Sequence, residues 1–64
     1  MFVAIEIQNN DGEISCIVNN YETKNAAEQQ YHTILAAAAV STLASHSAVM
    51  LTNTGDFVKS EYFL

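Results

Sequence analysis

In two segments of the first part of the chain every second residue is a large apolar residue or cysteine, which gives each segment one apolar face and is typical of half-buried β-strands. Two such segments, Phe2–Ile7 and Ile14–Val18, flank the pair Asp11-Gly12. Asp-Gly favours the tight turn of a β-hairpin, because both residues tolerate the positive φ angles of a type I′ turn. The first part of the chain is therefore predicted to form a β-hairpin.

A second pair of strand-like segments ends the chain. Ala48–Thr52 and Phe57–Phe63 are rich in residues that favour strands, and Gly55 lies in the polar stretch between them. Short polar residues over 45–47 are predicted to form the turn that leads into the first of these segments, since such residues favour turns over helices.

The middle of the chain has the period of a helix, predicted from about Asn25 to about Leu43. Thr23 or Asn25 is expected to cap its start, and Asn25 followed by Glu28 resembles a capping box. Its sheet-facing positions are Ala27, Tyr31, Ile34, Leu35 and Ala38.

These elements predict a single α+β domain over residues 1–64, a two-layer ββαββ fold with four antiparallel strands and one helix on one face. A helix is about 10 Å across and four strands are nearly twice as wide, so the helix covers only part of one sheet face. The more apolar face is expected under the helix: Val3, Ile5, Ile7, Ile14, Cys16, Val18, Val49 and Leu51. The other face is expected to carry Phe2, Ala4, Ile17, Ala48, Met50 and Phe57, with Glu6, Ser15, Lys59 and Glu61.

The second half of the predicted helix is apolar on every side, which indicates burial all round. One sheet cannot cover both sides of a helix, so a partner surface is expected, and symmetric self-association is the simplest way to supply it. The predicted oligomer interface consists of Ala36, Ala39, Val40, Leu43, Met50, Ile17 and Phe2.

The charge balance excludes several classes of partner. The net charge is −5, with only Lys24 and Lys59 positive. Nucleic acids and anionic membranes are bound through basic side chains, so neither is expected as a partner. No signal-peptide pattern opens the chain, and its longest apolar run, Ile34–Val40, is too short to span a bilayer. A cytoplasmic location is expected.

No group of residues predicts catalysis, a metal or a cofactor. Cys16 is expected to be a small core residue, because no nearby cation is present to activate its thiol. His32 is expected on the polar side of the helix, and His46 at its end, where a cation suits the helix dipole. Two histidines and one cysteine are too few for a structural zinc site, which needs about four ligands.

A weaker indication concerns an anionic ligand at the start of the helix, where free backbone N–H groups favour anions. The residues that would surround such a ligand are Lys24, Asn25, His32, Asn20 and Tyr21.

Three segments, Met1–Gln8, Tyr31–Ser41 and Lys59–Phe63, resemble a set of small uncharacterised proteins of Gram-positive gut bacteria and their phages and mobile elements. The resemblance implies a context in which small proteins bind host factors or sequester host signals. The first functional hypothesis is a non-enzymatic homo-oligomer that binds a host protein through its acidic surface. The second is a binder of a small ligand, such as a nucleotide-signal sponge that holds its ligand between subunits, and an enzyme is the least favoured.

Overall fold

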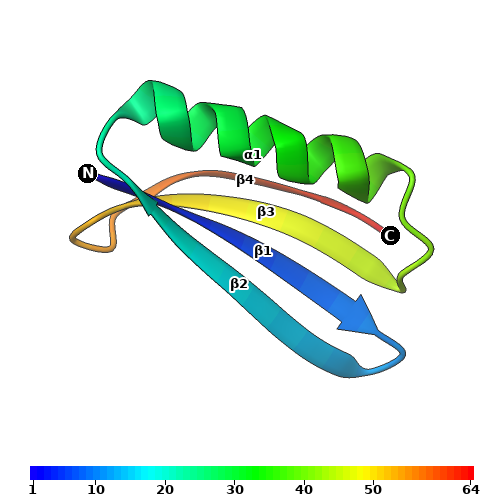
Figure 1. The fold of residues 1–64 in the computed structure, drawn as a ribbon. Coiled ribbons are helices and arrows are strands. Elements are labelled where there is room, and N and C mark those ends of the chain that lie inside the picture. The colour runs from blue at the N-terminus through cyan, green and yellow to red at the C-terminus, as the bar shows by residue number, and fades with distance from the viewer.

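The computed structural model describes all residues, 1–64, and confirms the predicted ββαββ α+β fold (Figure 1). The four strands form one antiparallel sheet in the order β2-β1-β3-β4, and α1 lies across one face of it. The elements are β1 (Phe2–Asn10), β2 (Glu13–Tyr21), α1 (Lys24–Ala39), β3 (Ser45–Thr52) and β4 (Phe57–Phe63).

The predicted first hairpin is confirmed, together with its turn. Asp11 and Gly12 both have positive φ, 55° and 93°, as a two-residue type I′ turn requires. The side chain of Asn9 accepts a hydrogen bond from the Gly12 N–H at 2.8 Å, which closes the turn. The strands on either side pair over their whole length, from Phe2 with Tyr21 to Asn10 with Glu13.

The helix begins as predicted but ends early. Thr23 is the N-cap, and its hydroxyl accepts the Ala26 N–H at 3.2 Å, whereas Asn25 lies inside the first turn. The end was predicted near Leu43, and α1 ends four residues earlier, at Ala39. The connection after it is tied to the sheet, because the Ala44 N–H donates to the Asn9 carbonyl at 3.0 Å. No helix in the structure is long and apolar enough to cross a membrane.

The segment predicted as a turn at 45–47 belongs instead to β3. Its residues pair with the far end of β1, with His46 opposite Gln8. His46 is therefore not at the exit of the helix. It lies on the central strand β3 and is only 5% exposed.

The core lies between α1 and the two central strands. The helix positions predicted to face the sheet are buried at Ala27, Tyr31, Ile34 and Ala38, and Leu35 packs against them. The strands contribute Ala48 and Met50, both fully buried, and Ala4, which is 1% exposed.

The predicted assignment of the two sheet faces is wrong, except that Phe57 lies on the side away from the helix as predicted. The helix covers Ala4, Ala48 and Met50, and the β-branched residues predicted beneath it point the other way. The physical reason is space. Alanines on the two central strands leave room beneath the helix, and Tyr31 and Ile34 fill it.

The edge strand β4 is irregular near its start. Leu51 pairs with Phe57 and Met50 with Lys59, so Val58 is an extra residue and forms a β-bulge. The bulge turns both Val58 and Lys59 toward the helix, where Val58 packs against the core.

Candidate functional site

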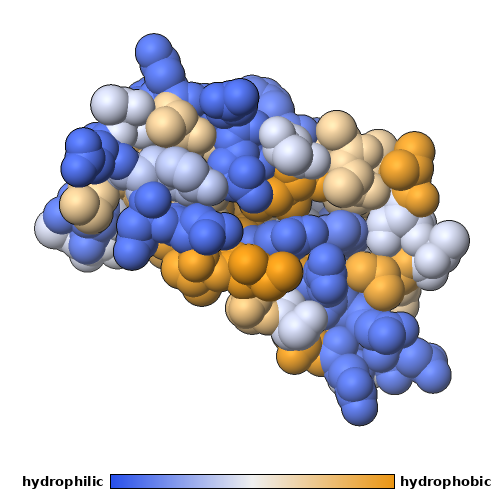
Figure 2. Space-filling view, viewed as in Figure 1, coloured by the Kyte–Doolittle hydropathy of each residue, from blue (hydrophilic) through white to orange (hydrophobic).

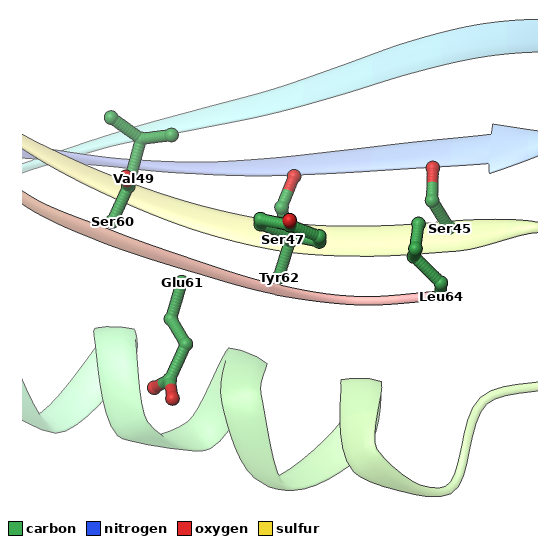
Figure 3. A pocket seen from close by; sticks show the side chains of 7 residues that line it. All are labelled: Ser45, Ser47, Val49, Ser60, Glu61, Tyr62 and Leu64. Carbon is green, nitrogen blue, oxygen red and sulfur yellow. The ribbon is translucent and has the colours of Figure 1, made fainter.

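The side of the sheet that faces away from α1 has no second layer over it, and we call it the open face. Figure 3 shows Ser45, Ser47 and Val49 of β3 pointing away from the helix, while Glu61 of β4 points toward it. The pairing registers extend this alternation to the whole sheet. The open face consists of Val3, Ile5, Ile7, Asn9, Ile14, Cys16, Val18, Asn20, Ser45, Ser47, Val49, Leu51, Phe57, Ser60 and Tyr62.

The open face is apolar and carries no charged side chain. Its outer residues are far more exposed than is usual for their type: Ile14 61%, Val18 57%, Phe57 66% and Tyr62 66%. All seven acidic residues and both lysines lie elsewhere. A contiguous apolar surface on a soluble protein marks an interaction site more often than not.

β2 is the least covered element of the molecule. Every one of its residues except Tyr21 is exposed, because α1 lies over the other strands and leaves β2 at the free edge (Figure 1). Ile17, which points to the helix side, is still 48% exposed. Figure 2 shows hydrophobic atoms in a band below the helix, with hydrophilic atoms at the start of α1 and at the tip of the β1–β2 hairpin.

A pocket of about 260 Å³ lies at one end of the open face, over β3 and β4 (Figure 3). Its wall is rich in hydroxyl groups and holds one aromatic ring. Apart from Glu61, whose side chain points to the helix, it has no charged side chain. The lining residues are Ser45, Ser47, Val49, Ser60, Glu61, Tyr62 and Leu64.

Cys16 lies on the open face and is exposed, so the prediction that it is a core residue is wrong. The cause is the reversal of the sheet faces, since Cys16 pairs with Ile7 on the side away from α1. Its thiol is consequently a natural reporter of whether the open face is covered.

His46 forms a buried pair with a carboxylate on the neighbouring strand. Its Nε2 lies 2.5 Å from Oε2 of Glu6, and Gln8 donates to the same oxygen at 3.0 Å. His46 Nδ1 is buried without a partner. Only Nε2 has an acceptor, so the tautomer with the proton on Nε2 fits this site. The pair joins β1 to β3 beneath the helix, and no hydroxyl or thiol group hydrogen-bonds to it.

A second polar cluster ties β4 to α1. Lys59 Nζ lies 2.5 Å from Oε2 of Glu28 and 4.8 Å from the centre of the Tyr31 ring. The hydrogen bond from Lys59 lowers the pKa of the Glu28 carboxyl below its ordinary value. Burial, with the negative charge of Glu61 nearby, raises the pKa of Tyr31.

The residues predicted to surround an anionic ligand do not gather in one place. Lys24 and Asn25 are exposed in the first turn of α1. His32 lies two turns further along the helix, where its Nε2 is 3.3 Å from Oε2 of Glu28. Asn20 points to the open face, whereas Tyr21 points to the helix side and packs against the core. No group of three His, Cys, Asp or Glu side chains is close enough to hold a metal ion.

The predicted oligomer interface is divided by the structure. Met50 is fully buried and Phe2 packs against the core, so neither belongs to an outer surface. Leu43 lies in the connection after the helix, and not on it, since α1 ends at Ala39. The remaining predicted residues, Ala36, Ala39, Val40 and Ile17, are exposed.

The serines of the pocket are difficult to recognise in the sequence, because a polar stretch next to a helix resembles a turn. Ser45 and Ser47 alternate with His46 and Ala48, and that period of two indicates a strand with a polar and a buried side. No protein-family model, no curated protein and no solved structure matches this chain.

Proposed function

We propose that this protein is a non-enzymatic binding protein whose working form is a homo-oligomer, assembled by packing the open faces of two copies together. The observation that carries the proposal is the open face itself: it is apolar, uncharged and uncovered in the single chain. Two such sheets would stack about 10 Å apart, with a helix on each outer side.

The size of the face is sufficient for a weak, reversible dimer. Four strands about 4.8 Å apart and about 25 Å long present roughly 500 Å² per copy. Two copies would bury about 1,000 Å² in total, which is about the minimum for a biological interface and below the roughly 1,200–2,000 Å² of stable ones. A small domain buries too little surface to be very stable alone, so association would also stabilise the fold.

The distribution of charge favours a second copy as the occupant of this face. Each copy has a net charge of −5, so two copies repel each other at long range. Because no acidic side chain lies on the open face, packing two of them together brings no like charges into contact. A basic partner would find no complementary charge there.

The surface that remains after this assembly carries every acidic residue of both copies. We propose that it binds a basic surface on another protein, in agreement with the first hypothesis from the sequence. Such binding would weaken as salt is added, whereas self-association through the uncharged faces would strengthen, because salt screens the repulsion between the two copies.

Sedimentation velocity of Ile5→Lys tests the assembly, because Ile5 lies on a central strand of the open face. The wild type is expected to sediment as an oligomer at tens of micromolar, and Ile5→Lys to lose open-face packing, because the charge would be buried without a partner. Ile5→Thr is the milder variant, and circular dichroism checks that each one folds. Val40→Lys is the matched control: Val40 is 83% exposed at the end of α1. If Val40→Lys sediments as a monomer while Ile5→Lys sediments like the wild type, the interface lies on the helix and the proposal is contradicted.

One observation favours a second candidate function, a small-ligand binder. The pocket places three serine hydroxyls and Tyr62 at the end of the open face, where a second copy would enclose it. Hydroxyls buried in an interface need partners, and a neutral, hydroxyl-rich ligand would supply them. A thermal-shift screen with sugars and nucleosides tests this, since a ligand that binds only the folded state raises its stability. If no compound raises the melting temperature of the wild type, or if the same compound raises that of Ser47→Ala equally, the pocket is excluded as the ligand site.

A further inference from the structure

We propose that β2 is a second association surface, and that its occupant is β2 of another copy, paired antiparallel across a two-fold axis. This inference goes beyond the packing of open faces, because it uses the backbone groups at the edge of the sheet. The two edge strands of the sheet, β2 and β4, differ in how well they are protected against pairing.

The β4 edge is protected against pairing. Its bulge at Val58 breaks the regular ladder, and Lys59 and Glu61 place charges beside it. Bulges and charged side chains are the features by which natural sheets block edge-to-edge contact. Lys59 is in addition held by Glu28 of the helix, so this edge has a fixed, charged border.

The β2 edge has none of these features. It runs for nine residues and pairs with β1 in an unbroken register. It contains no lysine, arginine or proline, and its one charge, Glu13, is at the end nearest the turn. Ile14, Ile17 and Val18 are each about half exposed or more. A long, regular, apolar edge of this kind is a template for another strand.

The turn determines which backbone groups point outward from β2. In a hairpin closed by a two-residue turn, the pair that flanks the turn, here Asn10 and Glu13, is hydrogen-bonded, and such pairs alternate along the ladder. The odd-numbered residues of β2 therefore bond to β1. The N–H and C=O groups of the even-numbered residues point to the free edge: Ile14, Cys16, Val18 and Asn20.

One register brings two copies of β2 into full overlap. Antiparallel pairing about Ile17 places that residue opposite itself, Cys16 opposite Val18 and Glu13 opposite Tyr21. The even-numbered residues then meet in hydrogen-bonded pairs, as their outward groups require. No acidic residue faces another, and the side chains of each face stay on that face. The two four-stranded sheets would become one of eight strands, with both open faces on the same side.

Nothing in the subunit blocks this approach. Figure 1 shows β2 at the side of the sheet away from α1, with no element beyond it. The pairing is self-complementary, which is the requirement for a closed two-fold dimer. It also leaves the open faces free to pack as proposed above, so the two contacts together would give a tetramer.

Disulfide cross-linking tests the register. In a Cys16→Ser background, Ile17→Cys puts two thiols at a non-hydrogen-bonded pair, with Cα atoms about 4.5 Å apart, within disulfide range. Oxidation is expected to shift the band on a non-reducing gel from 7.0 kDa to twice that mass. The matched control is Ser15→Cys on the same face of β2, whose two thiols would lie about 13 Å apart. It should stay at the monomer mass.

Two cross-linking results would overturn the proposal: no cross-link through Ile17→Cys in a folded variant, or equal cross-linking through Ser15→Cys. Sedimentation is a second measurement. Ile17→Lys is expected to halve the mass of the assembly, because two lysines would face each other at the two-fold axis. The control Ser15→Lys is expected to leave the mass unchanged. An unchanged mass for Ile17→Lys would also overturn it. Adding Ile5→Lys to the cross-linking variant separates the two proposals, since it should abolish face packing and leave the edge cross-link intact.

Discussion

Replacing Met50 by alanine is the sharpest test of which sheet face lies beneath the helix. Met50 is fully buried and belongs to the core cluster, while its neighbour Leu51 points to the open face. Because successive residues of a strand point to opposite sides, Met50→Ala and Leu51→Ala probe the two faces from almost the same point of the backbone.

The expected losses of stability differ in size. Truncating a buried methionine to alanine costs about 2–5 kcal/mol, because an enclosed cavity remains. Leu51→Ala leaves no enclosed cavity in the single chain, so a loss of about 1 kcal/mol is expected, the usual size for a point substitution. A domain of 64 residues has a total stability of roughly 3–10 kcal/mol, so Met50→Ala removes a large part of it.

Urea unfolding followed by circular dichroism measures both losses. The protein is kept dilute enough to be monomeric, so that association does not add to the apparent stability. The reasoning is refuted if Leu51→Ala destabilises the monomer as much as Met50→Ala does, because the open face would then be the packed one. At high concentration the loss for Leu51→Ala should grow, since Leu51 would then also be buried between copies.

Three further substitutions test the polar contacts beneath the helix. The lowered pKa of Glu28 contributes stability that is present above its ordinary value of 4.5 and is lost as the pH falls through its folded-state pKa. Lys59→Met removes the cation that lowers this pKa, so the free energy of unfolding should fall less steeply with decreasing pH than in the wild type. Urea midpoints between pH 3 and 6 measure this, and the same pH dependence in both proteins would contradict the ion pair. The raised pKa of Tyr31 contributes stability that is present below pH 10.0 and is lost as the pH rises through the folded-state pKa. Tyr31→Phe should therefore lose less stability in alkali than the wild type. The same alkaline loss of stability in both proteins would count against burial of this hydroxyl. Glu6→Ala leaves both ring nitrogens of His46 buried without a partner and should cost about 1–3 kcal/mol in urea unfolding, whereas a loss near zero would mean that water reaches the ring.

The elements of the fold could be predicted from the sequence because each carries a clear local pattern. Asp11-Gly12 defines the first turn, and the spacing of Ala27, Tyr31 and Ile34 defines the buried side of the helix. Thr23 was one of the two predicted caps. These features depend on residues close together in the chain, which sequence patterns describe well.

The faces of the sheet could not be predicted in the same way. Alternation shows that Val3 and Ile5 share one face and Ala4 the other, but it does not show which face the helix takes. The assumption that the more apolar face must be under the helix fails here. The helix packs on the side with small residues, where Ala4 and Ala48 admit it, and the β-branched side has no second layer over it.

The candidate site follows the same division. An apolar area mixed with charged residues such as Glu6 and Lys59 was expected on the side of the sheet away from the helix. The structure has an apolar area there without those charges, and with Ile5 and Val18 in place of Met50 and Phe2. The burial of His46 depends on its pairing with Gln8, far away in the chain, and local composition does not show that.

The most direct test of the open face as an interface between copies is the alkylation rate of the Cys16 thiol. It is measured across protein concentrations on the Ile17→Lys variant, in which edge pairing is removed. Open-face packing predicts fast modification in dilute solution that slows steadily as the concentration rises and copies cover the thiol. A rate that stays the same at every concentration would contradict the account.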